Sequence, residues 1–298
     1  MNEVLQQLMA FAPVETDRSF KDLTTLRIGG KIRYTIYPKD IIALDSVIGI
    51  LEAAAMPYKI VGKGSDLLCS DRDYDGAVIK LDRFFNDSYV DGDRMVADAG
   101  CSIIALSIEA MKNGLSGLEF ASGIPGTLGG ALFMNAGAYR SSMQDVVEEV
   151  CVYHDRIVEW MPLEACEFSY RTSIFQKHPD WIILAAVMKL TPENPESISA
   201  LMENRRERRM ASQPLDKPSC GSVFRNPENE NAWALIDGIG YRGRQIGGAR
   251  VSEKHCNFIL NVGNANAEDY MELVEEIQAK VFEKYGIRLE TEMEKFNW

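Results

Sequence analysis

The pattern of apolar and polar positions predicts both helices and strands along the whole chain. An alternating strand is expected after the turn in LTTLRIGGKIRYTIY (23–37), followed by a helix over about 39–55 and a short strand at YKIVG. We expect further strands at 76–81, 95–99, 147–153, 156–160 and 181–190, and helices within 1–15, 102–113 and 196–210. This order indicates a β-α-β unit that leads into mixed α+β structure.

The clearest helical periodicity lies near the C-terminus, at residues 266–285. Its apolar positions follow the i, i+3, i+4, i+7 spacing of an amphipathic helix: Tyr270, Leu273, Val274, Ile277 and Val281. Gly286 is expected to end this helix in a left-handed conformation. The alternation in IRLETEME then predicts a strand at 287–294, with Glu290, Glu292 and Glu294 on one face.

A break in the pattern suggests where the chain divides into domains. The stretch TPENPE at 191–196 contains two prolines and two acidic residues, a composition typical of a linker. We therefore expect one domain over residues 1–194 and a second over 195–298.

Charge and composition exclude several classes of protein. The 298 residues include 32 basic and 44 acidic side chains, a net charge of −12 that argues against nucleic-acid binding. An anionic ligand must then be held by local arginines, backbone amides or helix ends. The chain shows no membrane-spanning apolar run and no signal peptide, and its six cysteines and three histidines lack metal-site spacing, so we expect a cytoplasmic protein with reduced thiols and no metal.

Residues 117–139, GLEFASGIPGTLGGALFMNAGAY, are rich in glycine and apolar at once. The segment has a single charged residue, Glu119, whereas a flexible linker would be polar. Glycine allows the backbone to approach a ligand closely, and free N–H groups in such a loop bind anions. The alternative is a tightly packed turn without a ligand. Its six glycines are Gly117, Gly123, Gly126, Gly129, Gly130 and Gly137.

Another glycine loop, GKGSD at 62–66, directly follows a predicted strand; it is the first glycine loop along the chain, and the segment 117–139 is the second. Neither loop matches the Rossmann or P-loop spacing, and GKGS alone is also typical of an ordinary hairpin turn. Two such loops about sixty residues apart nevertheless suggest one dinucleotide held from two sides.

Other motifs supply candidate chemistry. Arg171 lies among aromatic residues, which predicts partial burial and an anionic partner such as a carboxylate. Ser222 is a strand-edge serine by the simplest interpretation; a hydrolase is excluded because GxSxG is absent, and nothing near Cys220 would activate its thiol. The segment 247–255 suits a polyanionic substrate or an ordinary polar loop equally well. The basic run RRERR at 205–209 is interpreted mainly as a solvated helix end.

Taken together, these motifs resemble the UDP-N-acetylenolpyruvoylglucosamine reductase family, also called UDP-N-acetylmuramate dehydrogenase. The resemblance runs in order through LTTLRIGG, VGKGSDLL, SGLEFASGIPGTLGGALFMNAGAY, SYRTSIF, QPLDKPSCGSVFRNP, GGARVSEKHCNFILN and LETE. The short interval between Arg171 and Ser222 resembles the compact type of the family, which lacks an inserted substrate-binding loop.

The resemblance implies an α+β fold with an FAD-binding domain of the vanillyl-alcohol-oxidase type, built from lobes at about 1–80 and 81–194, and a C-terminal substrate-binding domain. It implies bound FAD, NADPH and UDP-N-acetylenolpyruvoylglucosamine as substrates, a role in peptidoglycan precursor synthesis, and a monomer that is not inserted in a membrane.

The resemblance also implies roles for individual residues. Arg171, Ser222 and Glu292 would be catalytic, with Ser222 as the proton donor. FAD would be bound by Gly62, Gly64, Ser65, Asp66, Leu67, Ala99, Gly100, Gly117, Gly123, Ile124, Pro125, Gly126, Gly129, Gly130, Asn135 and Gly137. Substrate would be bound by Asn226, Arg250, Lys254 and His255. Alternatives are an FAD-dependent oxidase of the same fold and a flavin- or nucleotide-sugar-binding protein without turnover.

Overall fold

The computed structural model describes residues 3–298. These residues form two compact units, which we call unit 1 and unit 2. Unit 1 comprises residues up to 15, 35–63 and 77–209, and unit 2 comprises 16–34, 64–76 and 210–298. The units are defined by packing alone, so the functional domain limits expected from the sequence, 1–194 and 195–298, stay a prediction.

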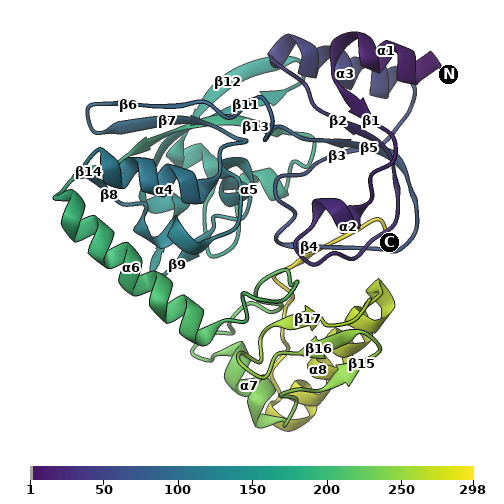
Figure 1. The fold of residues 1–298 in the computed structure, drawn as a ribbon, viewed down its shortest axis with the longest axis vertical. Helices are drawn as coiled ribbons and strands as arrows, with labels where there is room; N and C mark the ends of the chain where they lie inside the picture. Colours follow the sequence, from purple (N-terminus) through teal and green to yellow (C-terminus); the bar gives the residue numbers. More distant parts are fainter. Residues whose placement is uncertain (1–2) are drawn as a thin grey trace. The chain divides into compact units, whose positions relative to one another are not determined.

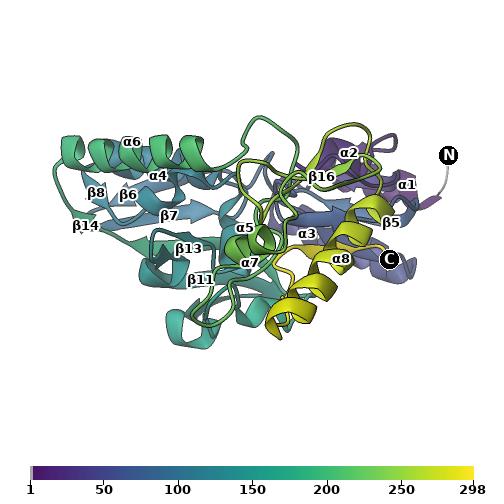
Figure 2. The same ribbon diagram turned by 90° about the horizontal axis from the view of Figure 1, so that it is seen from below.

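Unit 1 is built around a five-stranded antiparallel sheet in the order β12-β11-β13-β7-β6. These strands are Ile157–Pro162, Val147–His154, Ile182–Lys189, Arg94–Asp98 and Ser88–Asp91. The central strand β13, IILAAVMK, is largely buried because it is covered on both faces, as its nearly continuous apolar sequence requires. Helix α5 (Leu128–Phe133) packs against β13 and β7, and Figure 2 shows α4 (Ile103–Lys112) and α6 (Pro195–Ser212) on the same side of these two strands.

The remaining elements of unit 1 surround a smaller sheet and a set of short connections (Figure 1). The four-stranded sheet has the order β1-β2-β5-β3, from Val14–Glu15, Ile32–Ile36, Tyr74–Ile79 and Tyr58–Ile60. Of β2 and β5, unit 1 includes residues 35–36 and 77–79, and the earlier residues of both strands belong to unit 2. Helix α1 (Glu3–Phe11) packs on α3 (Ile41–Ala53), which begins where the Asp40 side chain accepts a hydrogen bond from Ala43 N. The short elements are β8 (Leu115–Ser116), η1 (Glu119–Gly123), β9 (Gly137–Ala138), β10 (Ser141–Ser142), η2 (Met143–Asp145), η3 (Leu163–Cys166), η4 (Ile174–Gln176) and β14 (Thr191–Pro192).

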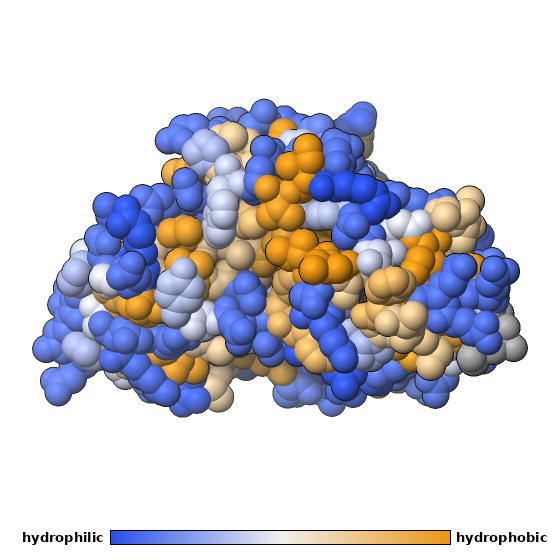
Figure 3. Space-filling model, turned by 90° about the horizontal axis from the view of Figure 1, so that it is seen from above, coloured by the Kyte–Doolittle hydropathy of each residue, from blue (hydrophilic) through white to orange (hydrophobic). Residues whose placement is uncertain are grey.

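The face of unit 1 that carries α1, α3 and β12 exposes several large apolar side chains. Figure 3 views this side and shows apolar side chains gathered near its centre, with hydrophilic side chains between and around them. Ile42 on α3 is 77% exposed, and Trp160 on β12 is 46% exposed. Arg156, which precedes β12, forms ion pairs with Asp45 and Glu52 of α3, so charge and apolar surface alternate across this face.

Unit 2 has a core formed by α8 and a three-stranded sheet. The sheet has the order β15-β16-β17. The elements of the unit are α2 (Phe20–Leu23), β4 (Leu67–Cys69), α7 (Ala232–Gly238), β15 (Gln245–Ile246), β16 (Ala249–Val251), β17 (Ile259–Asn261), α8 (Ala267–Tyr285) and β18 (Glu294–Phe296). The predicted apolar face of α8 is fully buried in this core, and Gly286 ends the helix with φ = 70°.

Most predicted elements are confirmed, but the closing strand is wrong in its position. Before Glu294, the predicted strand at 287–294 has an isolated antiparallel bridge between Thr291 and Phe224, and regular pairing begins with β18 at Glu294, parallel to β4. Leu289 and Met293 are buried, so the alternation reports burial correctly. The alternation does not indicate how many residues pair in a continuous ladder, because the length of the ladder depends on the neighbouring strand.

The capping box at the start of α8 gives a test of the fold. Asn266 accepts a hydrogen bond from Asp269 N at 2.7 Å, and Asp269 accepts one from Asn266 N at 3.3 Å. We expect Asn266→Ala to lower the free energy of unfolding by about 1 kcal/mol, since the cap satisfies an otherwise unpaired helix donor. Urea denaturation measures this, with Glu275→Ala on the exposed face of α8 as the control. An unchanged midpoint for Asn266→Ala would contradict the assignment.

Candidate functional site

The glycine-rich segment 117–139 lies entirely in unit 1 and includes η1, α5 and β9. Its only charged side chain, Glu119, is buried and accepts hydrogen bonds from Ser116 Oγ at 2.6 Å and Gly117 N at 3.0 Å. This carboxylate therefore fixes the start of the segment by satisfying local donors.

The two glycine loops meet at Gly62 and Thr127. A Cβ atom on Gly62 would overlap the Oγ1 of Thr127, so only glycine permits this approach. Thr127 also caps α5, since its Oγ1 accepts a hydrogen bond from Gly130 N at 3.3 Å. The backbone of the first loop thus lies directly against the start of the helix in the second, the arrangement that the hypothesis of a shared ligand requires.

A third segment, Ala99–Cys101, lies at the same place. Gly129 N donates to Ala99 O at 2.8 Å, and Leu128 N donates to Cys101 O at 2.9 Å. A Cβ on Gly129 would lie 3.1 Å from the Cβ of Ala99, closer than an ordinary contact. Three of the sequence segments predicted to bind the cofactor are therefore in direct contact within unit 1.

The glycines differ in what they make room for. At Gly126 a Cβ would meet nothing within 4 Å, and at Gly130 it would meet only Thr127 Oγ1 at 3.4 Å, so the space beside these two glycines is open. Their N–H groups already donate, to Ile124 O at 2.9 Å and to Thr127 Oγ1 at 3.3 Å. Protein atoms instead occupy the space beside Gly100, Gly117, Gly123 and Gly137. Packing accounts for glycine at these four positions, and their role in cofactor binding stays a prediction.

Lys80 supports the first loop and was missed by the sequence analysis. Its side chain is buried after the apolar strand β5, and its Nζ donates to Gly62 O and pairs with Asp82 at 3.3 Å. Burial lowers the pKa of Lys80, although Asp82 acts in the opposite direction. A lysine following directly on a run of buried apolar residues was the available signal, because such a lysine needs a partner.

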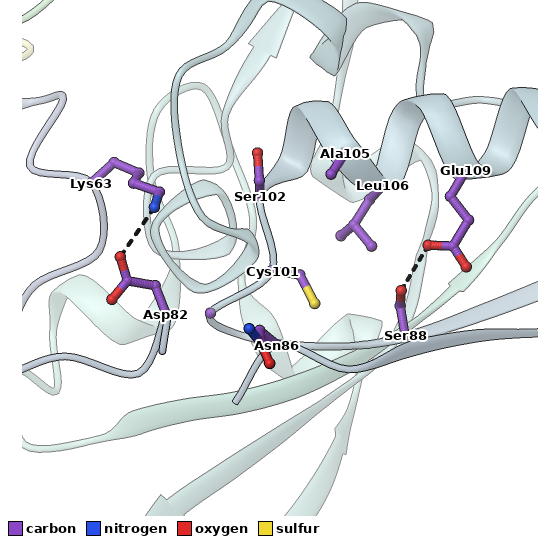
Figure 4. Close-up of a pocket in the computed structure, with 10 residues that line it drawn as sticks. Lys63, Asp82, Asn86, Ser88, Cys101, Ser102, Ala105, Leu106 and Glu109 are labelled. Carbon is purple, nitrogen blue, oxygen red and sulfur yellow. Dashed lines mark hydrogen bonds and ion pairs between the residues drawn. The ribbon is translucent and has the colours of Figure 1, made fainter. Parts of the chain in front are cut away.

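A cavity of about 250 Å³ lies beside these segments in unit 1 (Figure 4). The pair of Lys63 and Asp82, 3.1 Å apart, lines one side, and Ser88 and Glu109, 2.7 Å apart, line the other, with Cys101 between them. Small-molecule sites usually enclose about 300–1,000 Å³, so this cavity fits only part of a dinucleotide. Lys63 supplies a positive charge that suits an anionic cofactor, and the space beside Gly126 and Gly130 is open to one.

Asn135 connects the glycine-rich segment to the motif that contains Arg171. Its side-chain amide donates to Gln144 Oε1 at 3.1 Å and to Ser169 O at 2.8 Å, and its Oδ1 accepts from Gln144 N at 3.0 Å. The residue is buried with a left-handed φ of 41°, which asparagine tolerates better than most residues. Asn135 therefore positions neighbouring backbone through its side chain.

Arg171 is partly buried, as its aromatic surroundings predicted. Its guanidinium donates to Gly137 O at 2.9 Å and lies over the ring of Tyr170 at 5.2 Å. The residue has a φ of 54°, in a tight turn closed by reciprocal backbone hydrogen bonds between Ser169 and Thr172. A non-glycine residue in this conformation is strained, a feature that is often found at functional sites.

Ser222 and Glu292 come together in unit 2. Glu292 N donates to Val223 O at 2.8 Å, next to the bridge between Phe224 and Thr291. Ser222 directly follows Gly221, which has a φ of 81° and open space around it. The two predicted catalytic residues are thus carried by adjacent, hydrogen-bonded segments.

The same segment is held on its other side by Asn257, which the sequence analysis did not identify. Asn257 Oδ1 accepts from Phe224 N at 3.0 Å, its Nδ2 donates to Phe224 O at 2.8 Å, and its backbone O accepts from Val223 N at 2.9 Å. This buried amide satisfies the backbone directly after Ser222 and restricts its movement.

The second half of the first glycine loop, Gly64–Leu67, belongs to unit 2 and joins this cluster. Thr25 N donates to Gly64 O at 3.2 Å, and Glu294 N donates to Asp66 O at 2.9 Å. Gly64 needs its positive φ of 59° to make this turn. The predicted cofactor residues Ser65 and Asp66 are therefore close in space to the predicted catalytic segment at 292–294.

Cys220 is a buried thiol that lacks the properties of a nucleophile. Burial raises its pKa to about 12, and its Sγ lies 3.0 Å from the hydroxyl of Tyr270. The carboxylates of Asp66 and Glu292 act on it in the same direction. The thiol is neutral at physiological pH, which agrees with the expectation that nothing activates it.

The four predicted substrate residues all lie in unit 2 and differ in their environments. Asn226 Oδ1 accepts from Ala232 N at 3.1 Å at the start of α7, and Lys254 Nζ donates to Met210 O. The Nε of Arg250 and the Nδ1 of His255 are buried without a hydrogen-bond partner among residues 3–298. Such buried polar groups favour a ligand or a water as partner.

No group of side chains in the described residues has the arrangement of a metal site. Among those same residues, no helix combines the length and apolar character that crossing a membrane needs.

Comparison with known proteins gives consistent matches to both parts of the chain. Residues 213–296 match the C-terminal domain of UDP-N-acetylenolpyruvoylglucosamine reductase, and residues 32–156 match an FAD-binding domain. These matches confirm the expected α+β fold, an FAD-binding domain followed by a C-terminal domain.

Individual relatives cover almost the whole chain. It is 38% identical over 297 residues to the UDP-N-acetylenolpyruvoylglucosamine reductase of Bacillus velezensis, covering 99% of this chain and 98% of that protein. It is 41% identical over 272 residues to the enzyme of the same name from Thermotoga maritima, covering 91% and 94%. The crystal structure of the reductase from Thermus caldophilus superposes with a TM-score of 0.84 at 34% identity, covering 96% of this chain and 100% of that one.

The pKa values of two histidines test the surroundings that the structure gives them. Burial lowers the pKa of His255 below its usual value, whereas the hydrogen bond to Glu159 raises the pKa of His154. We expect NMR titration to show His255 neutral at a pH where His154 is already protonated. Below about pH 6.5, His255 therefore binds a proton in the unfolded state but not in the folded state. This difference lowers the free energy of unfolding as the pH decreases. His255→Gln assigns the resonance, and the reverse order of titration would contradict the structure.

Proposed function

Because the chain belongs to the UDP-N-acetylenolpyruvoylglucosamine reductase family, we propose that it reduces the enolpyruvyl group of UDP-N-acetylenolpyruvoylglucosamine to give UDP-N-acetylmuramate. NADPH would supply the electrons through bound FAD, within peptidoglycan precursor synthesis in the cytoplasm. The observation that carries the proposal is the hydrogen bond between Glu292 N and Val223 O, because it places two predicted catalytic residues on neighbouring segments.

The residues of the chain suit the proposed cofactor. The phosphates and part of an FAD molecule would be held where Gly62 approaches Thr127. The open space beside Gly126 and Gly130 and the adjacent cavity beside Lys63 belong to the same region. When bound, FAD would accept hydride from NADPH and transfer it to the terminal vinyl carbon of the substrate.

Reduction at the vinyl carbon leaves negative charge that spreads into the substrate carboxylate. A fixed guanidinium stabilises such charge most effectively where water is excluded, and we assign this role to Arg171. Its contacts with Gly137 O and the Tyr170 ring support the assignment, since they hold the guanidinium in one orientation before substrate binds.

The neighbouring carbon then needs a proton, and we assign its delivery to Ser222 Oγ. A serine hydroxyl is a weak acid, but a strongly basic enolate in a dry site takes its proton. Asn257 and the 290–292 segment support this role, because together they fix the backbone that follows Ser222.

A spectroscopic experiment tests the function as a whole. We expect the purified protein to be yellow, to bleach with NADPH in the absence of oxygen, and to recover its colour when UDP-N-acetylenolpyruvoylglucosamine is added. A colourless protein that takes up no FAD on reconstitution would overturn the proposal. Rapid recovery of colour with oxygen alone would favour an oxidase instead.

Replacing Ser222 tests the assignment of the proton donor. We expect Ser222→Ala to slow the oxidative half-reaction by about 10²–10⁴-fold, the usual contribution of a general acid, while NADPH reduces the flavin at nearly the wild-type rate. Stopped-flow absorbance separates the two half-reactions, and Ser219→Ala in the same loop is the matched control. An equal loss in both half-reactions would remove Ser222 from the role of proton donor.

A further inference from the structure

Helix α6 ends against the glycine-rich segment. Most of its basic run is exposed, as expected from the sequence, but Arg205 and Arg209 are partly buried. A Cβ on Gly123 would lie 2.8 Å from Cδ and 3.2 Å from Nη1 of Arg209. The missing Cβ at Gly123 therefore makes room for an arginine side chain. Both residues belong to unit 1.

Arg209 is a mostly buried cation for which the described residues supply no counter-charge. Its Nε is buried and has no hydrogen-bond partner among residues 3–298. Burial lowers the pKa of Arg209, and the nearby hydroxyl group of Tyr139 acts in the opposite direction. The guanidinium still stays protonated, and a buried charge without an anionic partner is costly. Such a side chain is suited to binding an anionic ligand.

Other arginines of α6 face the same segment through Tyr139. The guanidinium carbons of Arg205 and Arg208 lie 5.2 Å and 5.5 Å from the centre of the Tyr139 ring, and the Tyr139 hydroxyl donates to Arg205 O at 2.8 Å. Cations stacked on an aromatic ring keep their N–H groups available at the ring edge. The helix and the end of the glycine-rich segment are thereby fixed to each other.

The basic run divides into two classes of side chain. Arg206 is exposed and forms two hydrogen bonds of 2.9 Å with Glu203, three residues earlier on α6. An exposed pair of this kind contributes little beyond local helix stability. Arg206 therefore behaves as the sequence predicted for most of the run, and it provides an internal control for Arg209.

The geometry points to a phosphate-binding subsite formed by Arg209 and Arg205, for a nucleotide that lies along the glycine-rich segment. A planar guanidinium fork matches phosphate oxygens, and here it acts within a chain whose net charge is −12. Only the identity of the nucleotide rests on the proposed function, which supplies FAD, NADPH and a UDP-sugar as the three sources of phosphate.

The experiment uses the FAD-loaded enzyme and compares Arg209→Met, Arg209→Lys and the control Arg206→Met. Methionine keeps an unbranched stem against Gly123 and removes the charge, whereas lysine keeps the charge and loses the fork. Three affinities are measured: FAD by fluorescence on reconstitution, NADPH from anaerobic stopped-flow reduction, and UDP from the change in flavin absorbance. Thermal unfolding of each variant monitors the fold.

We expect Arg209→Met to weaken at least one nucleotide about tenfold or more, Arg209→Lys to weaken the same nucleotide less, and Arg206→Met to stay within about twofold of wild type. The affinity that changes identifies the source of the phosphate. Affinities within about twofold of wild type for all three nucleotides, or an equal loss in Arg206→Met, would overturn the subsite.

Two further outcomes keep the test decisive. If Arg209→Met does not fold, Arg205→Met and Arg209→Lys carry the same comparison, and unchanged affinities in both would overturn the subsite. FAD and UDP binding are measured without turnover, so a protein that binds them through Arg209 but does not reduce the enolpyruvyl sugar contradicts the proposed function and leaves the subsite standing.

Discussion

The contact between Gly62 and Thr127 is the constraint on which the arrangement of unit 1 depends. No side chain larger than hydrogen fits at Gly62, and Thr127 at the same point caps α5. Lys80 holds the carbonyl of Gly62 from the other side, which costs the burial of an amine that Asp82 partly offsets. This cost accompanies the contact between the GKGSD loop and the residue that caps α5, the contact on which the proposed cofactor site depends.

Individual arginine side chains place positive charge at particular points of a chain whose net charge is negative. A net charge of −12 repels anionic ligands at long range, so binding must come from cations placed at short range. Arg171 donates a hydrogen bond to Gly137 O and Arg209 lies beside Gly123, so two cations contact the glycine-rich segment. Preorganised arginines lose less entropy on binding, which increases the value of each contact.

In unit 2 the backbone N–H and C=O groups that follow Ser222 form hydrogen bonds with two different segments. Asn257 bonds to Val223 and Phe224, and the segment at 290–292 bonds to Val223 and Arg225. A hydroxyl that transfers a proton needs an accurate position more than an unusual pKa, and paired backbone hydrogen bonds supply that position. The buried amide of Asn257 therefore supports the role that we propose for Ser222 by fixing the backbone that follows it.

The sequence by itself determined the local features of this protein. Three features follow from residues within a few positions of one another: the period of α8, its stop at Gly286 and the two glycine loops. Together with the order of the motifs along the chain, these features sufficed to identify the fold and the family. Tertiary structure decided which glycines face open space, that Arg209 occupies the space beside Gly123, and that Glu292 follows an isolated bridge at Thr291 instead of lying within a regular strand. Each of these depends on a partner far away in the chain, and propensity and periodicity carry no information about such partners.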